Sequence, residues 1–142
     1  MEKVSIGITG ETPEDMAAMA RLAEAAGFDC GWAIELFRNA FTQTTFLGAK
    51  TESMGIGTAI AWGFVRSPMT MAMSAMDIDE ITGGRFRLGL GPGVKRLNET
   101  WHNAEYGRPR HGSPARHFAA DAAGLVRGVP TRRGTESLLY NR

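Results

Sequence analysis

Short apolar runs and amphipathic stretches alternate along the first two thirds of the chain. Residues 4–8 alternate apolar with small or polar side chains and stop at Gly10, which predicts a short strand. Thr12 and Pro13 form a helix start, and apolar residues then recur at helical spacing as far as Gly27. The chain therefore opens with a strand followed by a helix.

The same pair of elements is predicted twice more, and a fourth strand follows. Expected strands cover 28–35, 54–64 and 86–90, and expected helices cover 39–50 and 67–81. The second of these strands is almost continuously apolar, as in a strand buried on both faces of a parallel sheet. Strands that alternate with helices over short connections predict a parallel sheet with crossover helices.

The pattern weakens after Gly93. A polar segment follows, a further helix is expected from Ser113–Pro114 to about Arg127, and residues 128–142 read as an irregular basic tail after a single domain over 1–127. Four strands fit either an open doubly wound sheet or part of a barrel. Because a complete (β/α)8 barrel takes about 250 residues, this chain holds about half of one at most.

Composition excludes several classes of protein. Hydrophobic residues make up 43% and charged residues 22% of the 142 residues, which is typical of a globular domain. Cys30 is the only cysteine, so a disulfide framework is excluded. Without a secretory signal after Met1, or an apolar run near the ~20 residues of a membrane helix, we expect a cytoplasmic protein and no membrane partner.

Charge is distributed unevenly. Up to Gly107 there are nine Lys and Arg against thirteen Asp and Glu, whereas from Arg108 onwards there are seven Arg against two acids. A basic end can indicate nucleic-acid binding. These arginines are scattered among Pro and Gly and lack an aromatic platform, so we expect no nucleic-acid partner.

Two charged residues stand where parallel strands carry their sites. Glu35 ends the second apolar run, and Arg66 lies between the third run and the helix start at Ser67. Because sites gather at the carboxyl ends of such strands, Glu35 is a candidate catalytic carboxylate and Arg66 a candidate ligand for a substrate or other anion. Glu35 could instead meet water or pair with Arg38. Arg66 could instead form a structural ion pair with Glu35 or Asp77.

A glycine cluster at 89–93 follows the fourth strand. Its third glycine comes one residue early for a dinucleotide fingerprint, and residues 93–95 lack the ending of a P-loop. We interpret it as a tight turn in which Gly89 and Gly91, lacking side chains, leave room for a flat ligand above the strand ends.

No metal centre or hydrolase nucleophile is predicted. Glu99, His102 and Glu105 have helical spacing but supply only part of a di-iron ligand set. The sequence contains no G-x-S-x-G elbow, and Cys30 falls within an expected strand. Metal-dependent and hydrolytic chemistry therefore have no support in the sequence.

Three stretches, together with the spacing between them, resemble the luciferase-like monooxygenase superfamily. They are 27–36 (GFDCGWAIEL), 57–68 (GTAIAWGFVRSP) and 82–93 (TGGRFRLGLGPG). The resemblance covers residues 4–127, about the N-terminal half of such proteins, and is nearest to the coenzyme F420-dependent oxidoreductases. It implies an α/β fold that is part of a TIM (β/α)8 barrel, about four βα units with parallel strands, and a site at the C-terminal strand ends.

The resemblance also implies particular site residues. In the family a flavin or deazaflavin ring lies over a bulged third strand with a cis peptide bond, which by position would join Ala59 to Ile60. The acid that often ends the second strand is kept as Glu35, but the His that follows it in the family is replaced by Leu36. The cofactor-binding residues so implied are Thr58, Ala59, Ile60, Gly91, Gly93 and Asn98.

The implied function is that of an oxidoreductase using coenzyme F420 or, alternatively, FMN. A reduced deazaflavin would transfer a hydride to a small organic substrate, whereas reduced FMN would activate oxygen. Because family barrels are about twice as long and hold much of the cofactor phosphate with their second half, the alternative is a truncated, catalytically silent half-barrel that acts as a dimerising or flavin-docking module. A second copy or a missing second half-barrel is the expected partner. A flavodoxin-like domain is disfavoured, since residues 10–13 offer a poor phosphate loop.

Overall fold

The computed structural model describes residues 3–106, so the expected domain boundary at 127 and the helix expected over 113–127 lie outside the described residues. Within that part the elements are β1 (Ser5–Ile8), α1 (Pro13–Ala25), β2 (Cys30–Ala33), α2 (Ala40–Gly48), β3 (Gly55–Thr58), β4 (Ala61–Trp62), α3 (Pro68–Ile81), β5 (Phe86–Arg87), β6 (Leu90–Gly91) and α4 (Lys95–His102). This order contains the four predicted βα units. None of the helices between residues 3 and 106 is long and apolar enough to span a bilayer.

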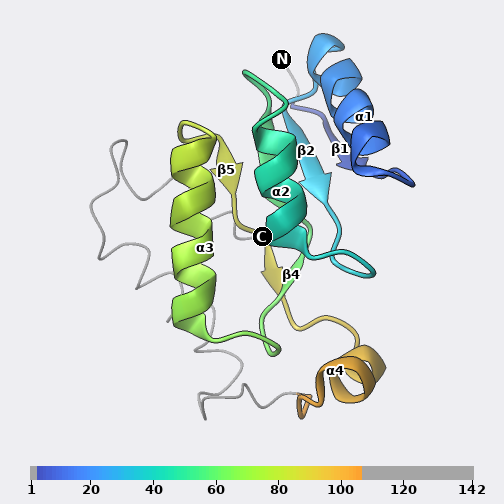
Figure 1. Cartoon of the computed structure of the whole chain (residues 1–142), viewed down its shortest axis with the longest axis vertical. Coiled ribbons are helices and arrows are strands. Elements are labelled where there is room, and N and C mark those ends of the chain that lie inside the picture. Colours follow the sequence, from blue (N-terminus) through green and yellow to red (C-terminus); the bar gives the residue numbers. More distant parts are fainter. Residues whose placement is uncertain (1–2, 107–142) are drawn as a thin grey trace.

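Two parallel sheets follow one another along the strand direction. The larger has the order β1-β2-β3-β5, with Ile6, Gly31, Ile56 and Phe86 side by side in one row. The smaller pairs β4 with β6. In Figure 1 the strands run toward the end where α4 lies, and α2 and α3 lie in front of the sheet. The predicted parallel sheet with crossover helices is confirmed.

The continuous strands expected over 54–64 and 86–90 are each broken in two, so that part of the prediction is wrong. The first breaks after Thr58, where the peptide bond between Ala59 and Ile60 is cis. The second breaks at Leu88 and Gly89, opposite the first. The two breaks lie side by side, so β3 and β5 are interrupted together. The first break agrees with the bulged third strand that the family resemblance implied.

The helices begin where the sequence places their caps. The Thr12 hydroxyl accepts a hydrogen bond from the Asp15 amide (3.1 Å), and the Asp15 carboxylate accepts one from the Thr12 amide (3.0 Å), which is a capping box. Asn39 caps α2, and Ser67 caps α3 by accepting from the Thr70 amide (3.0 Å). These caps fix where each helix leaves the preceding strand end.

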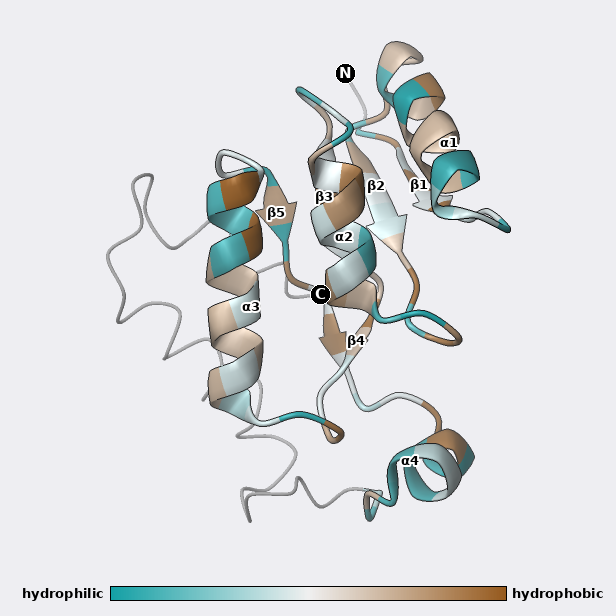
Figure 2. Ribbon diagram, viewed as in Figure 1, coloured by the Kyte–Doolittle hydropathy of each residue, from teal (hydrophilic) through white to brown (hydrophobic). Residues whose placement is uncertain are grey.

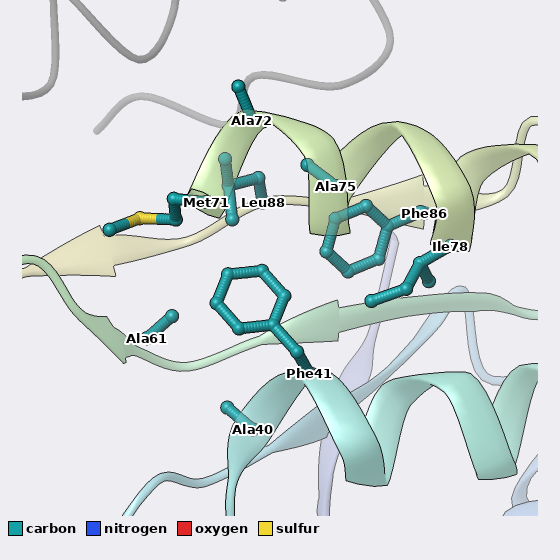
Figure 3. Close-up of a cluster of buried hydrophobic side chains, with 9 residues drawn as sticks. All are labelled: Ala40, Phe41, Ala61, Met71, Ala72, Ala75, Ile78, Phe86 and Leu88. Atoms are coloured by element: carbon teal, nitrogen blue, oxygen red, sulfur yellow. The ribbon is translucent and has the colours of Figure 1, made fainter. Parts of the chain in front are cut away.

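Two apolar clusters attach the helices to the sheet. The first lies between α2, α3 and β5, and Figure 3 shows the rings of Phe41 and Phe86 facing one another between the two helices. Its members are Ala40, Phe41, Ala61, Met71, Ala72, Ala75, Ile78, Phe86 and Leu88. The second lies under α1 and α2 and contains Ile8, Met16, Ala20, Ala23, Ala33, Leu47, Met54 and Ile56. Figure 2 shows the hydrophobic residues of α3 on its β5 side.

Helix α4 lies in the stretch after Gly93 that the sequence analysis described only as a polar segment. The helix buries a single side chain, that of Asn98, and leaves Trp101 half exposed. Its large apolar residues, Leu97 and Trp101, lie one turn apart among polar residues, so the helix is amphipathic but too short and too polar for the strand–helix pattern to have marked it. In Figure 1 it stands apart from the other three helices, beyond the strand ends.

Candidate functional site

The break between β3 and β4 lies at the carboxyl end of the larger sheet. Thr58 ends β3 with its side chain fully buried, Ala59 is exposed and Ile60 is half-buried. The amide of Ala59 still donates to the carbonyl of Ala33 on β2 (2.8 Å), and the cis peptide bond to Ile60 follows immediately. The predicted cis bond is therefore confirmed, and it lies at the carboxyl ends of the strands.

Thr58 and Gly89 form hydrogen bonds between the two broken strands. The Thr58 hydroxyl donates to the Gly89 carbonyl (2.7 Å) and accepts from the Gly89 amide (2.9 Å). That carbonyl also accepts from the Ala61 amide (2.8 Å), which starts β4. A Cβ at position 89 would lie only 2.1 Å from the Thr58 carbonyl oxygen, so only glycine allows this approach.

The expectation that Gly89 and Gly91 leave room for a ligand is wrong. The space beside Gly89 holds the Thr58 carbonyl, and a Cβ at Gly91 would lie 2.1 Å from Cδ1 of Ile60. The missing side chains make room for the neighbouring strand rather than for a bound molecule. The Ile60 side chain therefore packs against Gly91, beside the bulge.

Gly93 and Asn98 shape the turn from β6 into α4. Gly93 has φ +71°, and a Cβ there would come within 2.8 Å of the Trp62 ring and 3.0 Å of Nδ2 of Asn98. Asn98 is completely buried, and its Nδ2 donates to the carbonyls of Pro92 and Val94, both at 2.9 Å. Its Oδ1 is buried and accepts no hydrogen bond from the described residues, which is uncommon for a buried amide.

Glu35 and Arg66 form an ion pair with one another. The Arg66 guanidinium donates to both carboxylate oxygens, to Oε2 over 2.8 Å, and lies over the Phe41 ring at 5.3 Å. The Glu35 carboxylate also accepts from the amides of Trp62 (2.6 Å) and Ala40 (3.5 Å). Their side chains are 8% and 15% exposed, so the pair is largely shielded from water.

A carboxylate held by this many donors is poorly placed to remove a proton, because each lone pair already has a partner. The contacts of Glu35 therefore favour a positioning role, and its direct part in chemistry stays a prediction. Arg38, which the sequence also offered as a partner for Glu35, donates instead to the carbonyl of Glu11. The carboxylate is thus held by Arg66 from the loop after β4.

Aromatic contacts connect the strand ends with α4. The Trp62 ring meets His102 edge to face at 5.7 Å, and the exposed Phe37, in the loop after β2, meets Trp101 at 5.7 Å. Sequence reasoning missed Trp62, whose backbone and ring both contact site residues. The one feature of the sequence that could have indicated a role for Trp62 is Gly93, the small residue against which its ring lies.

Two grooves among the described residues lie away from the bulge. One of about 480 Å³ runs between the first turns of α1 and α2, and one of about 390 Å³ lies near Asp29, Arg85 and Arg87 at the amino ends of the strands. Within residues 3–106 no group of three His, Cys, Asp or Glu side chains could hold a metal ion. The candidate site at the strand ends therefore lies outside both of these grooves.

Comparison with known proteins agrees with this arrangement. The family model of the luciferase-like monooxygenases matches residues 2–119. A Mycobacterium tuberculosis protein, whose name assigns it provisionally to the coenzyme F420-dependent oxidoreductases, is 31% identical over 100 residues, which are 70% of this chain and 29% of that protein. The 5,10-methylenetetrahydromethanopterin reductase of Methanolobus tindarius is 38% identical over 80 residues, 55% of this chain and 24% of the enzyme.

Solved structures show the fold. The coenzyme F420-dependent tetrahydromethanopterin reductase of Methanopyrus kandleri superposes with a TM-score of 0.71 at 21% identity, over 89% of this chain and 40% of that one. The oxygenating constituent of 3,6-diketocamphane monooxygenase of Pseudomonas putida, in complex with FMN, gives 0.69 at 12% identity, over 90% and 40%. These neighbours are TIM barrels, so the described part has the fold of about half a barrel.

The chain spans about a quarter to a third of the length of the curated relatives it matches, and about 40% of the solved structures. Within that span the family model covers most of the residues, and the bulge with its cis bond lies where the family resemblance places it. The chain belongs to the luciferase-like monooxygenase family.

Proposed function

We propose that the chain provides the ring-binding side of a coenzyme F420-dependent oxidoreductase site, with FMN as the alternative cofactor. The printed names of two similar proteins support this cofactor class: the Mycobacterium tuberculosis relative is provisionally named a coenzyme F420-dependent oxidoreductase, and the Methanopyrus kandleri structure is of a coenzyme F420-dependent reductase. The bulge offers the exposed Ala59 and the half-buried Ile60 as a surface at the strand ends, where sites of this fold lie. The Thr58 hydroxyl fixes this surface through its hydrogen bond to Gly89, and Gly91 leaves room for the Ile60 side chain.

The observation that carries the proposal is the buried Oδ1 of Asn98, which has no hydrogen-bond partner among the described residues. A buried amide oxygen left unsatisfied costs about 1–3 kcal/mol, so such atoms usually have a partner in the working protein. A ring imide or a ribityl-type hydroxyl of a deazaflavin would supply an N–H or O–H donor. Gly93 lies beside this amide, where a Cβ would crowd the Trp62 ring and Nδ2 of Asn98.

The chemistry that such a cofactor supplies is transfer of a hydride to an organic substrate. The protein's part is to hold the ring against Ala59 and Ile60, to accept a donor at Asn98, and to keep the strand ends in register. Glu35 and Arg66 belong to this last task, because their contacts go to backbone rather than outward. A cytoplasmic location remains the prediction made from the sequence.

A second candidate function is that of a catalytically silent module that docks a second half-barrel or a second copy. It is favoured by β1 and β5, which are the outer strands of the larger sheet in the described part and leave one edge of each unpaired there. Steady turnover of reduced cofactor by the purified chain would exclude this candidate. Binding without turnover would favour it.

The test is a fluorescence titration of the purified chain with F420 and, separately, with FMN, with the mass measured by light scattering on the same sample. Micromolar binding of F420 is expected, weakened about tenfold in Asn98→Leu, which removes the free acceptor together with the two Nδ2 hydrogen bonds to the turn. Thr100→Ala is the matched control, since it alters an exposed hydroxyl of the same helix. Absence of binding to either cofactor would refute the proposal, and equal binding by the Asn98 variant would refute the role of that amide.

A further inference from the structure

Strand β4 has a strand on only one side among the described residues. The amides of Ala61 and Gly63 donate to the carbonyls of Gly89 and Gly91 (2.8 and 2.9 Å), which pairs β4 with β6. Successive residues of a strand direct their backbone groups to opposite edges. The amide and carbonyl of Trp62 therefore point the other way, toward the end of β2.

β2 does not continue to this height. Its last paired residue is Ala33, and the last backbone bond from this side is the one from the Ala59 amide. Instead, Oε2 of Glu35 accepts the hydrogen of the Trp62 amide (2.6 Å). The Arg66 guanidinium donates to the Trp62 carbonyl (3.3 Å) while also binding the Glu35 carboxylate. One side chain thus supplies the acceptor, and the other the donor, that a neighbouring strand would offer.

The position of the Trp62 ring affects the β6–α4 turn, which carries the proposed cofactor contact. Its ring packs against the open side of Gly93, and it contacts His102 at the end of α4. A shift of β4 along or away from the sheet would displace this ring, and with it the turn that carries Asn98. The Phe41 ring on the other side of the guanidinium belongs to the core between α2 and α3, so the pair is anchored to the rigid part of the fold.

We propose that the Glu35–Arg66 pair acts as a side-chain substitute for a neighbouring strand, holding β4 in register and thereby positioning the β6–α4 turn for the cofactor. Both are positioning residues, acting through the backbone of Trp62. The part of this inference that concerns the cofactor rests on the proposed function. The part that concerns β4 is independent of it.

The test compares Glu35→Gln and Arg66→Met with Asp29→Asn in the full chain. Asp29 forms an ion pair with Arg87 (2.6 Å) at the opposite ends of the strands, and both of these side chains are half-buried. The control therefore removes an ion pair of the same sheet without touching β4. Arg66→Lys is added as a milder variant, because it keeps the charge but loses the forked donor geometry.

Two readouts are measured on each variant. Hydrogen exchange of the Trp62 and Gly63 amides, followed by NMR, needs no cofactor, and we expect it to accelerate at least tenfold in Glu35→Gln and Arg66→Met. The dissociation constant for F420 should rise at least tenfold in the same variants and by an intermediate factor in Arg66→Lys. Asp29→Asn should change both quantities less than twofold.

Unchanged exchange at Trp62 in both site variants would overturn the inference, whatever the cofactor does. Faster exchange with an unchanged dissociation constant would overturn the positioning of the turn. A similar effect in Asp29→Asn would show a general loss of stability and also overturn it. If the unaltered chain binds neither F420 nor FMN, the proposed function fails and the cofactor claim with it, while exchange at Trp62 still decides whether the pair holds β4.

Discussion

Glu24 on α1 fixes the loop that leads into β3, and replacing it tests how the sheet is anchored. Its carboxylate accepts hydrogen bonds from the amides of Ser53 (2.6 Å), Met54 (2.8 Å) and Glu52 (2.9 Å), and from the Ser53 hydroxyl (3.0 Å). Burial alone would raise the pKa of Glu24, but these bonds outweigh it and lower the pKa from 4.5 to about 2. The folded state therefore favours the charged carboxylate.

The size of the effect follows from that shift. A lowering from 4.5 to about 2 corresponds to at most about 3 kcal/mol of stability at neutral pH. Because Glu24 is only half-buried, solvent screening reduces this to about 1–2 kcal/mol. A group whose pKa is depressed on folding contributes above its unfolded pKa, and this contribution disappears as the pH falls from about 4.5 toward about 2.

Glu24→Gln should therefore lower the free energy of unfolding by about 1–2 kcal/mol at pH 7, because a neutral amide oxygen accepts the loop donors more weakly than a carboxylate and the amide nitrogen would face the Glu52 amide. The measurement is urea denaturation of both chains between pH 7 and pH 2.5, where the difference should shrink with falling pH. Glu80→Gln, an exposed acid on α3, is the control and should change stability by less than about 0.5 kcal/mol. A difference that stays constant across this range, or is absent at pH 7, would refute the reasoning.

Three further changes test the strand breaks and the thiol. Gly89→Ala should destabilise the chain by about 1–3 kcal/mol in urea denaturation, since its new methyl group would meet the Thr58 carbonyl oxygen at 2.1 Å. Thr58→Val should cost about 1–3 kcal/mol in the same assay, because Gly89 loses both a donor and an acceptor; equal midpoints would contradict this. Burial raises the pKa of Cys30 to about 11, so iodoacetamide at pH 8 should label the folded chain far more slowly than the urea-unfolded chain.

The sequence predicts well the features that depend on local pattern. The strand–helix order, the caps at Thr12 and Ser67 and the parallel sheet all follow from residues close together in the chain. The breaks after Thr58 and at Gly89 do not follow from periodicity, because the apolar run continues through both. They depend on contacts between strands thirty-one residues apart, and only the family resemblance pointed to one of them.

The site residues divide in a similar way. Glu35 and Arg66 could be selected from their positions after strands, and an ion pair between them was one of the alternatives that the sequence offered for Arg66. That the partner is Glu35 and not Asp77 depends on how two loops meet in space. Gly89 and Gly91 were interpreted as space for a ligand, whereas the structure fills that space with the neighbouring strand. A glycine in a sequence shows that something approaches closely, and only the structure shows what it is.

The polar groups at these strand ends share one role, which explains both the strand breaks and the contacts of the site residues. β4 and β6 are only two residues long, and side chains satisfy backbone groups within and beside them. The hydroxyl of Thr58, the Glu35–Arg66 pair and the Nδ2 of Asn98 all bond to backbone atoms. Groups used in this way cannot also bind a substrate, so the presence of a charged side chain at a strand end is weak evidence for chemistry. The informative atoms are those left over, and we therefore propose the buried Oδ1 of Asn98, rather than the Glu35 carboxylate, as the atom that a ligand would contact.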